Sequence, residues 1–183
     1  MNHLGILRKE NTTLLVIDIQ ERLMPVIDQQ EQIFKNANCL IKGAEILNIP
    51  VVVTEQYPKG LGNTCTEIEL PELPAIFEKT CFSCMQSEQV LQQLEQAERK
   101  SLIICGVEAH ICVLKTALDA LKSGFEVHVV ADAVSSRTQE NKQIALERLR
   151  QSGVFIVSTE MALFQLIDEA GTEQFKAISK LIK

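Results

Sequence analysis

Hydrophobic and polar positions along the chain follow two periods, one typical of buried strands and the other of amphipathic helices. Short, nearly continuous apolar runs predict strands at residues 12–20, 49–55, 102–105, 125–133 and 154–158. Segments with apolar residues at helical spacing predict helices at residues 33–47, 87–100, 111–122, 139–151, 159–168 and 173–182. In the second of these helices, Ser87 is the expected N-cap, and Arg99 and Lys100 are expected in the last turn.

The predicted strands are almost entirely apolar and alternate with helices, which favours a parallel sheet with helices on both faces. A chain of 183 residues is expected to form a single domain, spanning residues 1–183. The sequence thus predicts an α/β fold, a three-layer α/β/α domain with a mostly parallel, Rossmann-like sheet. Ligands of such folds bind at the carboxyl ends of the strands, where the strand order reverses. Asp18 and Cys112 each follow a strand, so both are expected at that edge.

Residues 55–80 form a long stretch rich in Pro, Gly and Thr, with little regular pattern. Stretches of this length are usually functional or poorly ordered. Lys79 lies near its end, inside a short apolar segment. A half-buried lysine can neutralise a carboxylate and lower the pKa of a thiol, although a solvated side chain is the commoner outcome for any single lysine.

The overall charge and the hydropathy of the chain exclude several classes of function. The formal net charge is −6 and no basic patch stands out, which argues against a nucleic-acid partner. No apolar run approaches the ~20 residues of a membrane helix, and the first residues lack the pattern of a signal peptide. We therefore expect a cytoplasmic protein without a membrane partner, whose six cysteines are free thiols.

Cys112 is the thiol with the most distinctive position, at or near the start of a helix that follows a strand. Backbone N–H groups and the helix dipole at such a place favour a thiolate and can also hold an oxyanion. These surroundings predict a pKa one or more units below the ~8.5 of a free thiol. From position alone, a nucleophile and a small buried residue are equally good interpretations. Asp18 could act as a base for a thiol or cap the segment that follows it.

These candidate residues fall in motifs that resemble the isochorismatase-like cysteine hydrolases. The resemblance runs from about residue 12 to about residue 168 and rests on "LLVIDIQ" with Asp18 and Gln20, "EKTCFS" with Lys79 and Ser83, "GVEAHICV" with Cys112, and "VVADAVSSRT". The stretch "TEQYPKGLG" is most similar to the subgroup of isochorismatase-domain proteins that has no settled substrate.

The resemblance implies a catalytic triad of Asp18, Lys79 and Cys112. Cys112 would attack an amide-type carbon of a small molecule and form a thioester, with Asp18 as the proton acceptor and Lys79 balancing the charges. A cis peptide bond between Val107 and Glu108 is also implied, with the N–H groups of Glu108 and Cys112 forming an oxyanion hole. This chemistry requires no metal and no organic cofactor, and the resemblance further implies a homo-oligomer.

The chain departs from the zinc-binding, nicotinamidase branch of this family at residues 54–57, where histidine is missing. We therefore predict no metal site and disfavour nicotinamide as the substrate. Four residues are candidates for the walls of a substrate pocket: Gln20, Tyr57, Phe82 and His110. A polar cluster of Asp132, Ser136 and Arg137 is interpreted as structural, with Arg137 bridging to Asp132 or to a partner subunit.

Two other classes of function remain open. Cys81 and Cys84 form a C-x-x-C motif, which is also found in redox proteins and in metal sites. A thioredoxin-like motif would follow the first strand and open a helix, whereas this one follows a long loop. The other alternative is a binding or scaffold protein that has kept the fold without the activity.

Overall fold

The computed structural model describes residues 4–72 and 74–183 and is built around a parallel β-sheet. Six strands in the order β3-β2-β1-β4-β5-β6 make up the sheet in the described part of the chain, and every neighbouring pair is parallel. Their bounds are β1 (Thr12–Ile17), β2 (Val51–Gln56), β3 (Ala75–Lys79), β4 (Ser101–Val107), β5 (Glu126–Ser135) and β6 (Phe155–Val157). The predicted α/β fold with a Rossmann-like sheet is confirmed.

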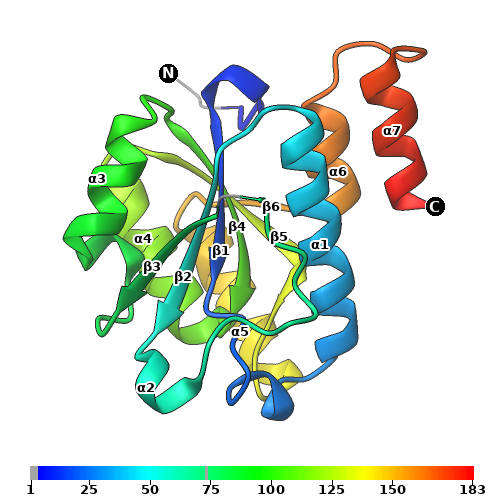
Figure 1. Cartoon of the computed structure of the whole chain (residues 1–183). Coiled ribbons are helices and arrows are strands. Elements are labelled where there is room, and N and C mark those ends of the chain that lie inside the picture. The colour runs from blue at the N-terminus through cyan, green and yellow to red at the C-terminus, as the bar shows by residue number, and fades with distance from the viewer. Residues whose placement is uncertain (1–3, 73) are drawn as a thin grey trace.

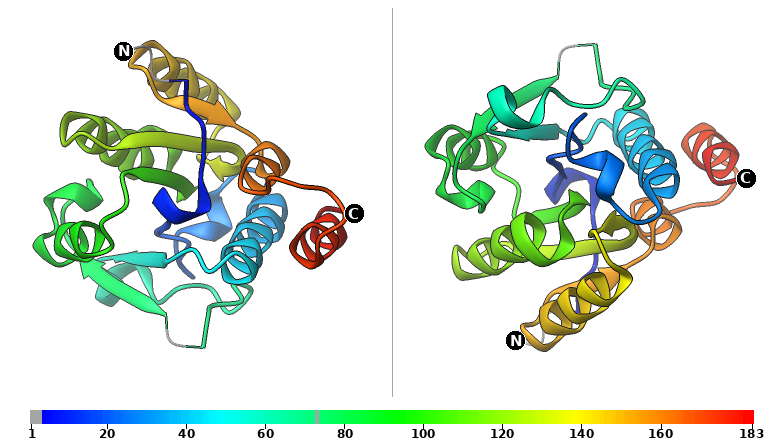
Figure 2. Two further views of the ribbon diagram at one scale, coloured as in Figure 1. Left: turned by 90° about the horizontal axis from the view of Figure 1, so that it is seen from above. Right: turned by 90° about the horizontal axis from the view of Figure 1, so that it is seen from below.

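Helices cover both faces of the sheet, as the two end-on views show (Figure 2). They are α1 (Gln30–Ile46), α2 (Pro58–Leu61), α3 (Glu88–Gln96), α4 (Leu114–Lys122), α5 (Gln139–Gln151), α6 (Thr159–Gln165) and α7 (Glu173–Ile182). One face packs against α1 and α6, with α7 lying outside these two helices, and the other face packs against α3, α4 and α5 (Figure 1). None of the helices in residues 4–72 and 74–183 combines the length and apolar character needed to cross a bilayer.

Strand β1 shows why an unbroken apolar run is required at the centre of the sheet. Leu14 and Val16 enter the core shared with α1, whereas Leu15 and Ile17 enter the core on the opposite face. Side chains alternate along a strand, so a strand buried on both faces must be apolar at every position. All six residues of β1 are buried, and Asp18 follows directly at its carboxyl end.

The strand order reverses between β1 and β4, and a glycine permits the two strands to meet closely there. Gly106 has φ +110°, and a Cβ at this position would lie 2.0 Å from the backbone oxygen of Ile17. Only glycine fits both the conformation and the space. The reversal therefore brings the residues after β1 and β4 together at one edge, where ligands of this fold bind.

Two local predictions are wrong. Strand β3 lies inside residues 55–80, which the sequence pattern did not resolve into elements. The four residues before the buried Lys79 alternate between half-buried and exposed positions, a pattern too short to stand out beside prolines. Helix α3 ends at Gln96, and the chain turns at Glu98 with φ +53°, so Arg99 and Lys100 lie beyond its last turn. The Arg99 guanidinium instead donates to the carbonyl oxygen of Thr12, at 3.0 Å.

The cysteines are free thiols, as predicted. Cys105 is fully buried on β4, on the sheet face that packs against α1. Cys39 on α1 is half-buried, with its sulfur 3.8 Å from the carbonyl oxygen of Leu181.

His128 on β5 is expected to make the stability of the protein fall in mild acid. Its ring is buried, stacks on Phe155 and lies 3.1 Å from a carboxylate oxygen of Glu126. Burial lowers the pKa of His128 below its ordinary value of 6.5. The unfolded chain then binds more protons below pH 6.5 than the folded protein does, so the free energy of unfolding decreases as the pH falls through this value.

Urea unfolding on either side of pH 6.5 measures this effect. The loss is at most about 1.4 kcal/mol per pH unit for one group, and His128→Leu should show a smaller loss than the wild type. An equal loss in both proteins would mean that other groups cause the acid sensitivity.

Candidate active site

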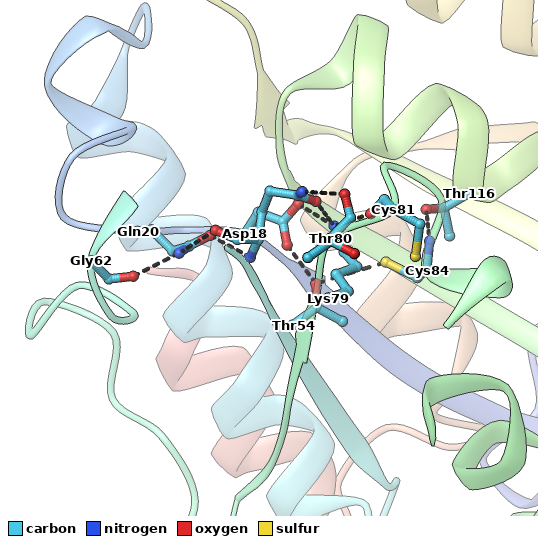
Figure 3. A network of polar contacts seen from close by, with 10 residues as sticks. Asp18, Gln20, Thr54, Gly62, Lys79, Thr80, Cys81, Cys84 and Thr116 are labelled. Carbon is cyan, nitrogen blue, oxygen red and sulfur yellow. Dashed lines mark hydrogen bonds and ion pairs between the residues drawn. The ribbon is translucent and has the colours of Figure 1, made fainter. Parts of the chain in front are cut away.

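A buried ion pair between Asp18 and Lys79 lies at the carboxyl edge of the sheet (Figure 3). The Lys79 Nζ lies 2.7 Å from Asp18 Oδ2, and neither side chain is exposed. Thr54 Oγ1 donates to the other carboxylate oxygen, Asp18 Oδ1, at 2.7 Å. Asp18 comes from the end of β1, Thr54 from β2 and Lys79 from the end of β3, so three neighbouring strands build this pair.

Gln56 is a second partner of the lysine, which sequence reasoning missed. Lys79 Nζ donates to Gln56 Oε1 at 2.7 Å and makes a longer contact of 3.4 Å with the carbonyl oxygen of Cys81. The Gln56 Nε2 donates to the carbonyl oxygen of Thr80, which fixes the side-chain oxygen toward the lysine. The only available signal was the pairing of Gln56 with Lys79 in adjacent strands, and that required knowledge of β3.

Gln20, expected in the pocket wall, has a side chain that makes hydrogen bonds within the protein. Its side chain is fully buried; Nε2 donates to the carbonyl oxygens of Gln56 and Gly62, and Oε1 accepts from the Gln56 N–H at 2.7 Å. Both amide hydrogens are thereby occupied. Gln20 therefore fastens the end of β2 to the chain near Gly62 and is a structural residue rather than a pocket wall (Figure 3).

Cys112 lies in a π-helical turn, Ala109–Val113, that links β4 to α4. The peptide bond between Val107 and Glu108, immediately before this turn, is cis. Only 6% of Cys112 is exposed, and its thiol lies near enough to Asp18 to help lower the pKa of that carboxyl. The structure thus brings Asp18, Lys79 and Cys112 into one buried cluster, in which the carboxylate pairs with Lys79 and lies beside the thiol.

The predicted decrease in the pKa of Cys112 is wrong. Burial and the negative charge of Asp18 raise the pKa of this thiol, and the opposing effect of Lys79 is smaller. Burial also raises the pKa of Asp18, although the ion pair with Lys79 and the hydrogen bonds from Thr54 and Cys112 limit the increase. A helix N-terminus and a lysine lower the pKa of a thiol, as expected, but desolvation and the nearby carboxylate raise it by more.

Alkylation of Cys112 should therefore respond oppositely to the loss of each charged neighbour. Asp18→Asn removes a negative charge that raises the pKa of the thiol, so alkylation at a fixed mildly alkaline pH should become faster. Lys79→Met removes the positive charge that lowers this pKa, so alkylation should become slower. Iodoacetamide rates at Cys112, followed by peptide mass spectrometry across a pH series, test both signs. The same direction of change in both variants would contradict the electrostatic account.

The turn that carries Cys112 is held by the loop after β5. Arg137 donates from Nε and from its backbone N–H to Glu108 Oε2, at 3.1 and 3.2 Å. His110 Nδ1 lies 2.9 Å from Ser136 Oγ. The predicted bridge from Arg137 to Asp132 is wrong, because Asp132 accepts instead from the N–H and hydroxyl of Thr159. Of the predicted polar cluster, Ser136 and Arg137 support His110 and Glu108, whereas Asp132 lies apart from them and binds Thr159.

The remaining pocket candidates lie in different surroundings. Tyr57 is 54% exposed and, together with Lys79, lines a cavity of about 470 Å³ that does not include Cys112. Phe82 is 50% exposed and lies outside this cavity, with Lys115 Nζ 5.5 Å from the centre of its ring. Of these two aromatic residues, only Tyr57 adjoins the buried cluster through a cavity.

Residues 54–57, where this chain departs from the zinc-binding branch, include a carboxylate that is engaged in hydrogen bonds within the protein. Glu55 Oε1 accepts from both the N–H and the hydroxyl of Thr64, at 2.6 and 2.7 Å. Within residues 4–72 and 74–183, no three or more His, Cys, Asp or Glu side chains gather as a set of metal ligands.

Comparison with known proteins assigns the family. A sequence model described as the isochorismatase domain matches residues 12–161. Isochorismatase domain-containing protein 2 of Danio rerio is 45% identical over 100% of this chain and 92% of its own length. A secreted isochorismatase effector, Isc1, of Phytophthora sojae is 46% identical over 98% of this chain and 88% of its own. The solved structure of the MAR1 ribonuclease from Caenorhabditis elegans is 38% identical, with a TM-score of 0.91 over 96% of this chain and 91% of that one. The chain therefore belongs to the isochorismatase family of hydrolases.

Proposed function

We propose that this protein is a cysteine hydrolase that cleaves a C–N amide-type bond of a small molecule through a thioester on Cys112. The observation that supports this proposal is the buried Asp18 carboxylate, which pairs with Lys79 at 2.7 Å and lies beside the Cys112 thiol. A base, a nucleophile and a balancing cation gathered at one place are the groups that acyl transfer requires.

In the first step, Asp18 accepts the proton of the Cys112 thiol while the sulfur attacks the carbonyl carbon of the substrate. The raised pKa of Cys112 means that the thiol is protonated at rest, so a base in direct contact is needed. The N–H groups of Glu108 and Cys112 would stabilise the oxyanion. Asp18 then donates its proton to the departing nitrogen, which leaves as an amine, and the acyl group remains on sulfur.

In the second step, water hydrolyses the thioester. Asp18, which has given up its proton to the amine, accepts a proton from the attacking water. The tetrahedral intermediate collapses with cleavage of the C–S bond; the acid is released, and the proton on Asp18 returns to the Cys112 sulfur. The cycle balances with one water consumed, and Cys112 and Asp18 supply its nucleophile and its base without a metal or an organic cofactor.

Lys79 would keep Asp18 in the ionised form that can accept a proton. Burial alone favours a protonated, neutral Asp18, and the ammonium group 2.7 Å away favours the carboxylate. Burial also disfavours the charged form of Lys79, but its attraction to the Asp18 carboxylate raises the net pKa of Lys79. Lys79 therefore remains a cation while the proton moves between Asp18, Cys112 and the substrate.

The closed surroundings of Cys112, of which 6% is exposed, favour a small-molecule substrate over a polymer. We also propose a cytoplasmic homo-oligomer as the working form. One relative is named as a secreted effector, and the solved structure of the YcaC gene product of Escherichia coli is described as an octameric hydrolase. Fractionation of the native cells and light scattering of the purified protein test these two points.

The test of the proposed function is a screen of small amides and ureas, with mass spectrometry of the protein during turnover. The expected result is an acyl adduct on Cys112 and release of an amine, both unaffected by Cys105→Ala, which changes a buried thiol on the other face of the sheet. A protein with the fold but no turnover and no adduct would be a scaffold. Cleavage of RNA by the wild type and by Cys112→Ala alike would contradict the cysteine mechanism and would favour a nuclease.

A further inference from the structure

Cys84 is a second buried thiol beside the candidate active site, and the proposed hydrolysis does not use it. It is fully buried in the same core cluster as Cys112, on the sheet face that packs against α3, α4 and α5. Its sulfur lies 3.7 Å from Thr54 Oγ1, the hydroxyl that donates to Asp18 Oδ1 at 2.7 Å. The thiols of Cys84 and Cys112 therefore approach the same carboxylate, one through Thr54 and one directly.

The backbone of Cys84 is fixed against the helix that carries Cys112. The Cys84 N–H donates to Thr116 Oγ1 at 2.9 Å, a buried hydrogen bond (Figure 3). Thr116 lies in α4, which begins directly after the π-helical turn that carries Cys112. Cys84 and Cys112 share one core cluster, and the negative charge of Asp18 raises the pKa of both thiols, so both lie beside this carboxylate.

The two cysteines of the C-x-x-C motif lie in different surroundings. Cys81 is half-exposed and lines the cavity beside Lys79, whereas Cys84 points into the core. Cys105 lies on the opposite face of the sheet from both Cys84 and Cys112. Cys84 is therefore the buried thiol that shares a core cluster with Cys112, whereas Cys81 faces the cavity.

We propose that Cys84 and Cys112 form a reversible disulfide when the protein meets hydrogen peroxide, and that this bond switches the active site off. The Cys112 sulfur, deprotonated by Asp18, attacks one peroxide oxygen; the O–O bond breaks, water leaves, and Cys112 becomes a sulfenic acid. The Cys84 sulfur then attacks the Cys112 sulfur, and its proton leaves with the hydroxyl group as a second water. Peroxide is reduced to two waters, and the two thiols are oxidised to one disulfide.

Two consequences follow from this chemistry. The disulfide removes the nucleophile of the proposed hydrolase until a thiol reductant restores it. It also diverts Cys112 from the irreversible sulfinic and sulfonic acids. The proposal rests on the proposed function only in assuming that Asp18 activates Cys112, and its test requires no substrate.

The experiment exposes the wild-type protein to hydrogen peroxide, blocks the remaining thiols and maps the tryptic peptides. Cleavage after lysine and arginine puts Cys81 and Cys84 in the peptide 80–99, and Cys105 and Cys112 in the peptide 101–115. The expected product is a linkage between these peptides that fragmentation assigns to Cys84 and Cys112. Labelling of Cys112 by iodoacetamide should be lost with the same time course and should return after treatment with dithiothreitol.

Two matched variants identify which cysteine forms the disulfide with Cys112. Cys81→Ser should form the linkage at the wild-type rate, whereas Cys84→Ser should accumulate a Cys112 sulfenic acid that dimedone traps, followed by sulfinic acid. A Cys81–Cys84 bond in the wild type, or sulfinic acid at Cys112 without any linkage, would overturn the disulfide and leave the proposed hydrolysis intact. Complete resistance of Cys112 to peroxide would contradict both proposals, because Asp18 would then fail to activate the thiol.

Discussion

Hydrolysis of any substrate that the screen identifies should fall by about 10⁴-fold or more in Cys112→Ala, as expected when a nucleophile is removed. The remaining groups can still bind the substrate, but no side chain in the cluster can form the acyl intermediate. Lys79 and Asp18 stay paired at 2.7 Å, and the substitution removes one sulfur atom from a mostly buried position. The variant should therefore fold normally, and the loss should appear in kcat.

Cys112→Ser is the informative companion to this variant. A serine hydroxyl has a far higher pKa than a thiol, and Asp18 is expected to be too weak a base to activate it, so activity should stay near that of Cys112→Ala. Steady-state kinetics and the circular dichroism spectrum of both variants provide the measurement. Retention of more than about a tenth of the wild-type rate in Cys112→Ala would rule out Cys112 as the nucleophile, because loss of a covalent nucleophile costs orders of magnitude.

Lys79→Met should be among the most destabilising single substitutions in the protein. It leaves the Asp18 carboxylate buried without its cation, and breaking a buried ion pair in this way costs about 3–5 kcal/mol. For a chain of this size, each kcal/mol lowers Tm by about 2–4 °C, so we expect a decrease of roughly 6–20 °C. Methionine matches the length of the lysine, which keeps the packing of the aliphatic part.

The double variant Asp18→Asn, Lys79→Met separates the effect of the charges on stability from the effect of packing. Asn is the suitable replacement because Asp18 has φ +52°, a conformation that Asn and Asp tolerate better than most residues. With both charges removed, most of the lost stability should return, while hydrolysis stays abolished. Calorimetric Tm values of the two single variants and the double variant measure how strongly Asp18 and Lys79 depend on each other for stability. Purely additive losses would mean that the ion pair does not stabilise the fold.

The sequence was sufficient to predict the sheet and to place two residues of the candidate site, Asp18 and Cys112. Strands with a continuous apolar run, such as residues 14–17 of β1, carry a clear signal because both of their faces are buried. Asp18 and Cys112 could be placed at one edge because parallel strands share their carboxyl ends. Lys79 could be singled out only as a lysine in a short apolar segment, and its role followed from the family resemblance, since its strand β3 has a pattern too short to recognise.

The contacts that set the chemistry could not be predicted from the sequence. Thr54 and Gln56 become partners of Asp18 and Lys79 only when β2 is known to lie between β1 and β3. The raised pKa of Cys112 depends on burial, which a local motif does not report. Cys84 looked like half of a C-x-x-C pair until its hydrogen bond to Thr116 related it to the helix of Cys112.

The position of β3 at the edge of the sheet has a consequence for hydrogen exchange. This strand pairs only with β2, and Ile76 and Glu78 are exposed, so few contacts oppose its local opening. Its last residue nevertheless carries the cation of the candidate site, and the ion pair to Asp18 fastens the edge to the central strand β1. Amides of β3 should exchange faster than those of β1 and β4, and a ligand that tightens the Asp18–Lys79 pair should protect them first. Deuterium uptake in β3 would then report occupancy of the site before any substrate is known.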